Sequence, residues 1–192
     1  AIGAAVLGAV GPREDIQLDL GRLDLGPEYD RCAIEEQLRE AGLAGECVPD
    51  LPCRVAELLR DGRIVMWFQG RMEYGPRALG QRSVLARPDR PELRDRLNLV
   101  LKRRVWYQPF CPSLLESEGP RLLADWTGGR NRAMTMAYQV AESHRGSLAG
   151  VISVDGTCRP QLVPDAGTTG FAELLRQARR LWGVGAVLNT SF

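Results

Sequence analysis

The sequence predicts a mixed α/β (α+β) protein, because strand-like and helical segments alternate along its 192 residues. RIVMWFQ (63–69) and AVLNTSF (186–192) are apolar runs typical of strands. FAELLRQARRLWG (171–183) has apolar residues at helical spacing and ends on a glycine that can cap a helix. Hydrophobic residues make up 44% of the chain and charged residues 26%, which is enough apolar surface for one sizeable core.

In the first third of the chain we expect three helices, at 1–10, 28–41 and 53–62, with a candidate domain boundary around Pro49–Pro52. The 63–69 strand follows the third helix. Because that run is continuously apolar, we expect it to be buried on both faces of a sheet.

In the rest of the chain we expect a strand at 83–86 and a helix at 91–104 that begins on Pro91. The apolar stripe of this helix is predicted to be Leu93, Leu97, Val100 and Leu101. Arg94, Asn98 and Lys102 align on another face, and a solvated surface is the simplest interpretation of them. Further strands are expected at 134–140, 150–154 and 159–163, the last two joined as a hairpin by Asp155-Gly156-Thr157.

The segment QGRMEYGPRALGQRS (69–83) follows the first strand directly. Its glycines allow the backbone to turn sharply and to expose N–H groups to an anion. Its arginines carry planar forks that bind phosphate or carboxylate. The glycines are Gly70, Gly75 and Gly80, and the arginines are Arg71, Arg77 and Arg82.

The same spacing also fits a purely structural turn in which Arg77 and Arg82 form salt bridges with Glu73 and Asp89. Spacing leaves both interpretations open. The segment is neither a Walker A loop nor a dinucleotide-binding fingerprint, since it contains neither glycine pattern.

Charge is unevenly distributed although the formal net charge is only +1. Residues 71–104 hold ten Arg/Lys against four Asp/Glu, a net +6 that leaves −5 for the remainder. This excess suits an anionic ligand, either small phosphates or a nucleic-acid backbone. Aromatic residues are only 6% of the chain, which argues against nucleic acid.

The five cysteines form no C-x-x-C pair and the chain has a single histidine, His144, which argues against a zinc site. We therefore predict no metal ligands. Free thiols in a reducing cytoplasm are the simplest account. The opening AIGAAVLGAV is too short to span a bilayer and lacks the basic start of a signal peptide. We interpret the sequence as a fragment of a larger two-domain protein.

Five blocks in order resemble the C-terminal domain of the carbamoyltransferase family, which includes the O-carbamoyltransferases of antibiotic and Nod-factor biosynthesis (NodU type). The blocks are WFQGRMEYGPRALGQRSVLARP, RDRLNLVLKRR, QPFCPSLLE, DGTCRPQLV and LNTSF. The resemblance implies that 51–192 is a YrdC-like domain, truncated at its end, with an open twisted mixed sheet flanked by helices. It assigns 1–50 to the end of an N-terminal actin/Hsp70-like domain and a linker.

The resemblance further implies that this domain binds carbamoyl phosphate and ATP, with Mg²⁺, and forms carbamoyl adenylate. The N-terminal domain would then pass the carbamoyl group to a hydroxyl of a small-molecule acceptor. Matched residue by residue, the expected catalytic ligands of the phosphate or carbamoyl groups are Arg77, Lys102 and Arg159. The expected substrate-binding residues are Gly75, Arg82, Gln108, Asn189 and Ser191.

The chain departs from the family pattern at three positions within or next to these blocks. Val105 stands where the family has glutamate, Gln108 where it has an anion-binding arginine, and Ser153 where it has histidine. A glutamine lacks the charge and the bidentate fork of arginine. A diverged, non-catalytic domain that binds a nucleotide or an acyl phosphate is therefore an alternative, as is RNA-related binding through the basic segment.

Overall fold

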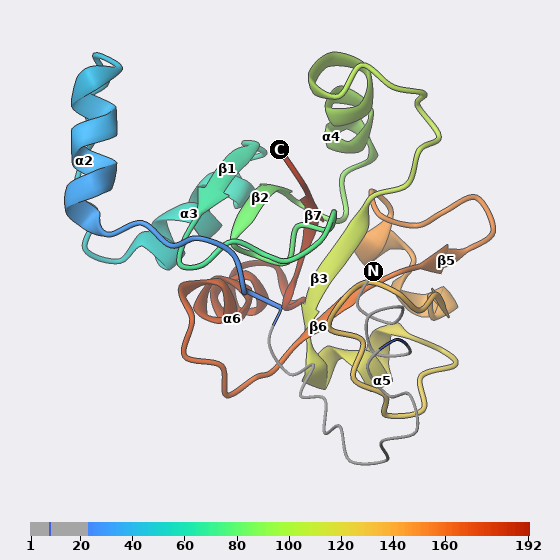
Figure 1. Cartoon of the computed structure of the whole chain (residues 1–192). Helices are drawn as coiled ribbons and strands as arrows, with labels where there is room; N and C mark the ends of the chain where they lie inside the picture. The colour runs from blue at the N-terminus through green and yellow to red at the C-terminus, as the bar shows by residue number, and fades with distance from the viewer. Residues whose placement is uncertain (1–7, 9–22) are drawn as a thin grey trace.

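The computed structural model describes Gly8 and residues 23–192, so the predicted helix at 1–10 lies almost wholly outside the described residues. A five-stranded mixed sheet runs through the centre of the described part, in the order β1-β2-β7-β3-β6 (Figure 1). Neighbouring strands are antiparallel except β3 and β6, which are parallel. The strands are β1 (Val65–Phe68), β2 (Arg82–Ala86), β3 (Cys111–Leu115), β6 (Gln161–Val163) and β7 (Ala186–Thr190). The prediction of a mixed α/β fold is confirmed.

Each face of the sheet is covered by its own hydrophobic cluster, because side chains along a strand alternate between the faces. Helices α3 (Leu51–Arg60) and α6 (Gly170–Trp182) pack on the face that carries Leu85, Leu115 and Val187. The opposite face carries Val84, Leu114 and Leu188. It is covered by α4 (Pro91–Arg96), η1 (Leu97–Leu101), α5 (Gly119–Leu122) and the pair β4 (Tyr138–Gln139) and β5 (Thr157–Cys158).

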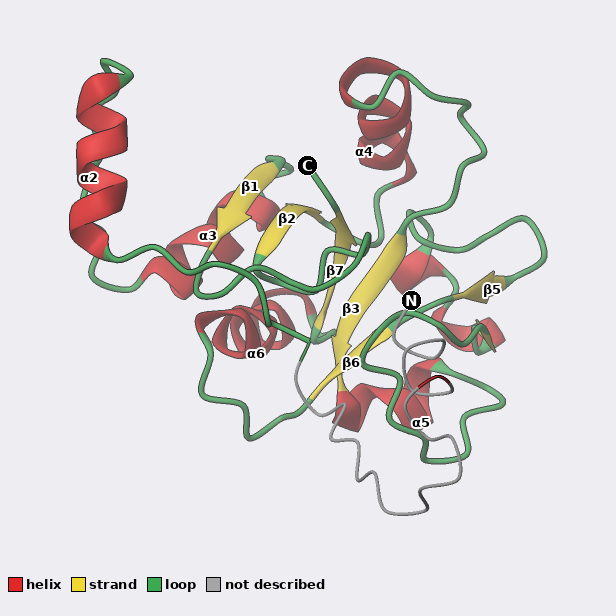
Figure 2. Cartoon of the chain, viewed as in Figure 1, coloured by secondary structure: helices red, strands yellow, loops and turns green. Residues whose placement is uncertain are grey.

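The remaining elements are short or peripheral. Three 3-10 turns, η2 (Glu116–Glu118), η3 (Glu142–His144) and η4 (Gly146–Leu148), lie in the connections. Helix α2 (Arg31–Glu40) projects away from the sheet and contributes no buried residue (Figure 2). No helix among the described residues is long and apolar enough to cross a membrane.

The prediction that the first strand is buried on both faces is wrong. In β1 only Trp67 is buried, whereas Met66 and Phe68 are exposed. The reason is the position of β1 at the edge of the sheet, where one face lacks a covering helix. A continuous apolar run therefore did not distinguish a central strand from an edge strand.

The helix predicted at 91–104 is shorter than expected and changes type. The α-helical part ends at Arg96, and a π-helical turn over η1 follows. Leu93 and Leu97 are buried as predicted, but Val100 and Leu101 are exposed. Asn98, assigned to a solvated face, is fully buried, because the wider π turn rotates it inward.

The hairpin predicted across 150–163 is also wrong. Residues 150–154 form turns, not a strand. The strand predicted at 159–163 is β6, which pairs with β3, while the short β5 before it pairs with β4. The strand predicted at 134–140 is reduced to Tyr138–Gln139. Long-range pairing outweighed the local turn pattern here.

Two glycines of the 69–83 segment provide a stability test. Gly75 and Gly80 both have positive φ, 99° and 96°, but a Cβ on Gly80 would overlap the Phe171 ring whereas one on Gly75 meets nothing within 4 Å. We expect Gly80→Ala to cost about 3 kcal/mol, from strain plus overpacking. Gly75→Ala should cost about 1 kcal/mol, from strain alone. Urea denaturation measures both losses, and equal losses would contradict the close packing of Gly80 on α6.

Candidate functional site

The turn after β1 is organised by one buried carboxylate. Glu73 is 6% exposed, and its Oε1 accepts hydrogen bonds from the backbone N–H groups of Leu79 (2.7 Å), Gln81 (2.8 Å) and Arg82 (3.0 Å). Glu73 therefore serves the backbone of the turn. The salt bridges considered from the sequence do not form. Glu73 bonds to backbone N–H groups, and Asp89 pairs with Arg87 instead of with Arg77 or Arg82.

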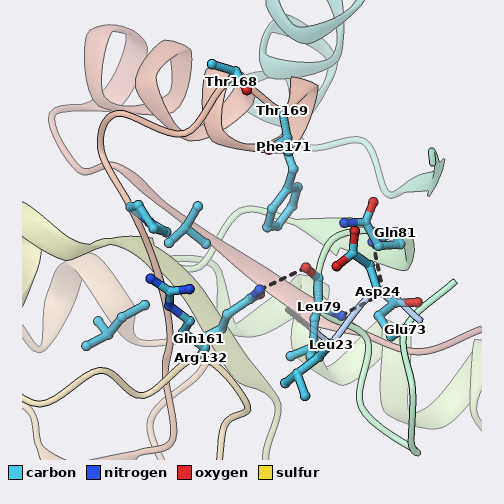
Figure 3. Close-up of a pocket in the computed structure, with 13 residues that line it drawn as sticks. Leu23, Asp24, Glu73, Leu79, Gln81, Arg132, Gln161, Thr168, Thr169 and Phe171 are labelled. Atoms are coloured by element: carbon cyan, nitrogen blue, oxygen red, sulfur yellow. Dashed lines mark hydrogen bonds between the residues drawn. The ribbon is translucent and has the colours of Figure 1, made fainter. Parts of the chain in front are cut away.

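Side chains on three strands donate hydrogen bonds to the backbone carbonyl groups of the same turn. Asn189 Nδ2 on β7 donates to Ala78 O (3.1 Å), and Gln161 Nε2 on β6 donates to Leu79 O (2.8 Å; Figure 3). Trp67 Nε1 on β1 donates to Gly80 O (3.0 Å). Because both the donors and the acceptors of the turn are satisfied by buried groups, its path over the sheet is fixed.

A cavity of about 210 Å³ opens beside this turn, between it, the loop before β3, the start of β6 and the end of β7. It brings together five of the residues predicted to bind ligand: Arg77, Gln108, Arg159, Asn189 and Ser191. Of the described residues that line it, three are arginines and none is acidic. The other lining residues are Pro76, Ala78, Arg104, Pro109, Phe110, Cys111, Met134 and Thr190.

Two more predicted residues lie next to this cavity. Lys102 donates from Nζ to the carbonyl of Ser191, and its pKa is lowered by burial and, to a lesser extent, by the charge of Arg104. Gly75 lines an adjoining cavity of about 560 Å³, which shares Arg77 and Arg159 with the first. Together the two cavities offer more room than a phosphate requires.

The structure places Arg82 outside both cavities. Its guanidinium donates to the backbone carbonyls of Gln69 (2.7 Å) and Gly70 (3.0 Å), and it stacks on the Phe68 ring at 3.5 Å. These contacts tie the two ends of the turn together. Arg82 therefore has a structural role in this conformation, because its charge is used to hold the backbone of the turn.

Arg104 lines the cavity although the sequence analysis did not single it out. Asn98 Oδ1 accepts from its Nε (2.7 Å), and the guanidinium lies 4.4 Å from the centre of the Phe110 ring. Its Nη2 is buried and bonds to no described residue, and burial lowers its pKa. Of the run Lys102-Arg103-Arg104 the resemblance singled out only Lys102, and no sequence signal showed that the Arg104 side chain turns toward the cavity.

The thiol of Cys111 also lines the cavity. Burial raises its pKa, while Arg159 and Arg77 act in the opposite direction without cancelling that effect. The thiol is therefore protonated at neutral pH and contributes shape, not charge, to this wall.

A third cavity, of about 410 Å³, lies on the other side of the turn, toward the start of α6 (Figure 3). Thr168, Thr169 and Phe171 form one wall, and Leu79 and Gln161 form another. None of the residues predicted to bind ligand lines it. Among the residues that the structure describes, no group of His, Cys, Asp or Glu has the arrangement of a metal site.

Three arginines, Arg77, Arg104 and Arg159, thus converge beside the ends of strands in a mixed α/β sheet. Residues 56–192 match the family model of the carbamoyltransferase C-terminus. The chain belongs to the carbamoyltransferase family, which confirms the resemblance found in the sequence.

Curated relatives agree with this assignment. The chain is 38% identical over 201 residues to nodulation protein NolNO of Sinorhizobium fredii, covering all of the chain and 29% of that protein. It is 33% identical over 198 residues to nodulation protein NolO of Bradyrhizobium diazoefficiens, covering all of the chain and 36% of that protein. An uncharacterized protein of Methanocaldococcus jannaschii is 39% identical over 202 residues, with 32% of its length covered. The chain thus spans about a third of the length of these relatives.

Removal of the Glu73 carboxylate tests its role in the turn. Glu73→Ala leaves three backbone N–H groups without their acceptor, and we expect a loss of more than about 3 kcal/mol of stability. Glu73→Gln keeps a neutral acceptor oxygen and should cost less, about 1–2 kcal/mol. Glu46→Ala, at an exposed loop position, is the control and should change stability by less than about 0.5 kcal/mol. If Glu73→Ala behaves like the control in urea denaturation, the turn does not depend on this carboxylate.

Proposed function

We propose that the chain is the part of an ATP-dependent O-carbamoyltransferase that binds carbamoyl phosphate and ATP and forms carbamoyl adenylate. The observation that carries the proposal is the cavity beside the 69–83 turn, where Arg77, Arg104 and Arg159 converge with no acidic residue among the described lining. Both substrates are rich in phosphate, and fixed cations in a partly dry site bind such groups strongly.

The chemistry needs charge neutralisation more than covalent participation by the protein. Hydrolysis of the acyl–phosphate bond gives carbamate and inorganic phosphate. A carbamate oxygen then attacks the α-phosphorus of ATP, and the bond to the β-phosphate breaks to release pyrophosphate. Negative charge accumulates on the transferring phosphoryl oxygens. Arg77, Arg104 and Arg159 are suited to offset it, with Lys102 at the rim.

The described residues of the cavity fit ATP better than they fit a protein-held metal. Their arginines match phosphate oxygens, whereas no lining carboxylate is present to coordinate Mg²⁺. Mg²⁺ would therefore be held by the phosphates of the nucleotide, as hard cations with few protein ligands often are. Gly75, with its open surroundings and positive φ, leaves its backbone free to approach a phosphate.

Transfer of the carbamoyl group to the hydroxyl of a small-molecule acceptor belongs, in this proposal, to the remaining two thirds of a protein built like the relatives. The nodulation proteins NolNO and NolO are the relatives that motivate this step. The second candidate is a binding domain that holds nucleotide or acyl phosphate without turnover. Gln108 favours it, because a neutral amide lines the cavity where the family has an arginine.

Pyrophosphate release from ATP and carbamoyl phosphate tests the proposal. With a full-length protein that carries this chain, we expect release that requires both substrates. Arg77→Ala and Arg159→Ala should each lower the rate at least about 100-fold, since each removes a cation from the reacting charge. Arg60→Ala, on the exposed surface of α3, should leave the rate unchanged. Absence of release together with absence of binding of either substrate in calorimetry would contradict the proposal.

Gln108→Arg separates the two candidates. Restoring the charge and the bidentate fork should tighten phosphate binding about tenfold. If the native chain already releases pyrophosphate, Gln108→Arg should increase the rate of that release. If the native chain binds both substrates without turnover and only Gln108→Arg releases pyrophosphate, the non-catalytic candidate holds.

A further inference from the structure

An apolar surface is exposed around η1 and the loop that follows it. Within residues 99–107, six large apolar side chains have exposed fractions of 45–69%. We call these six the η1 patch: Leu99, Val100, Leu101, Val105, Trp106 and Tyr107. The last two pack edge to face, with 5.6 Å between their ring centres. A contiguous exposed group of this kind marks a surface that another molecule covers.

Two features of this chain enlarge the η1 patch. Val105 stands where the family pattern has glutamate, so an apolar side chain replaces a charge at the surface. Val100 and Leu101 were predicted to face inward, but the helix changes to a π turn and both are exposed. The patch therefore reflects the particular sequence of this chain as well as its fold.

Basic side chains accompany the η1 patch. Residues 94–107 hold five Arg/Lys and one acid, Asp95, which gives this stretch a net charge of +4. Arg96 and Arg103 are exposed, and neither forms an ion pair within the described part of the chain. A partner that covers the patch therefore needs apolar side chains together with negative charge.

Helix α2 and its flanks have that chemistry. Residues 28–46, which we call the α2 surface, hold six Asp/Glu and two Arg, a net charge of −4, and all six acids are exposed. Tyr29, Ile34 and Leu43 have exposed fractions of 53%, 38% and 61%, and no residue of α2 is buried. The chain thus carries two exposed surfaces that are both partly apolar and have opposite charge.

The two surfaces stand apart at one end of the molecule. In Figure 1, α2 and α4 rise on either side of the C-terminus, so the α2 surface does not cover the η1 patch of its own chain. A second copy, turned by 180° about a twofold axis beyond the C-terminus, sets each α2 surface opposite the other copy's η1 patch. Both contacts then form together, and the assembly closes at two chains.

We propose that this chain forms a closed dimer in which the α2 surface of each copy docks on the η1 patch of the other. Pairing of like surfaces is disfavoured, because it would bring −4 against −4 or +4 against +4. The inference does not rest on the proposed function, since neither the six residues of the η1 patch nor those of the α2 surface line the arginine cavity.

Sedimentation equilibrium of the native chain is the first test. We expect a monomer–dimer equilibrium with a Kd on the order of 10 µM, as suits a small interface. Raising NaCl from about 50 mM to about 500 mM should weaken the dimer at least about fivefold, because salt screens the opposite charges. A chain that stays monomeric at about twenty times the expected Kd overturns the proposal.

Charge reversal on each surface identifies the pairing. One variant carries Glu36→Arg with Glu40→Arg on α2, and the other carries Arg96→Glu with Arg103→Glu beside the η1 patch. Each variant alone should dimerise at least about tenfold more weakly than the native chain, because both of its contacts then join like charges. An equimolar mixture should form a heterodimer, since each α2 surface again meets a patch of opposite charge. Recovery of association on mixing also shows that both variants are folded.

Val105→Glu tests the apolar part of the η1 patch. The substitution places a carboxylate opposite the acidic α2 surface of the other copy, and the Kd should rise about tenfold. Val154→Glu is the matched control, because Val154 is 90% exposed and lies outside both surfaces, and it should leave the Kd unchanged. Equal effects of the two substitutions would remove the η1 patch from the interface.

Other occupants of the η1 patch give different results. A native dimer with no heterodimer on mixing overturns the pairing of α2 with the patch. A dimer of the chain that is absent from a full-length protein carrying it also overturns the proposal, because the rest of that protein then covers these surfaces. Binding to vesicles of phosphatidylserine and phosphatidylcholine, lost in Val105→Glu and without any dimer, assigns the patch to a lipid surface instead.

Discussion

The acceptance of three backbone N–H groups by the Glu73 carboxylate is the interaction on which the site depends. Without it, a segment with three positive-φ glycines would have many accessible backbone paths and a high entropic cost of ordering. With it, the backbone from Leu79 to Arg82 is drawn around one buried oxygen. Arg77, just before this stretch, then stands at the cavity with its charge uncommitted to any ion pair among the described residues.

The outer side of the turn is held by a second set of contacts that reaches into the sheet. Asn189, Ser113 and Gln161 lie side by side on β7, β3 and β6 and connect the strands to the carbonyls of Ala78 and Leu79. Polar residues buried on a sheet are costly unless each is bonded, and here all but one of their groups is. The exception is Asn189 Oδ1, which is buried and accepts no hydrogen bond from any described residue.

Much of the fold followed from local pattern, and the errors share one physical cause. Helix α6 was predicted within one residue of its start, because its apolar periodicity and its glycine C-cap agree. The 63–69 run and the 150–163 hairpin failed because burial and strand pairing depend on partners distant in sequence. In the site, five predicted residues meet in one cavity, and those positions came from the family resemblance. Arg104 was missed because its inward direction is set by two contacts distant from it in sequence, with Asn98 on the π turn and with the Phe110 ring before β3.

In the proposed function, the arginine cavity receives the phosphate of an acyl phosphate beside an ordered glycine turn. A crystal structure of the chain with carbamoyl phosphate tests it most directly. We expect the phosphate oxygens to lie within hydrogen-bond distance of at least two of Arg77, Arg104 and Arg159, with the Glu73 contacts unchanged. Carbamoyl phosphate bound instead in the hollow beside Thr168 and Phe171, with the arginine cavity unoccupied, would contradict it.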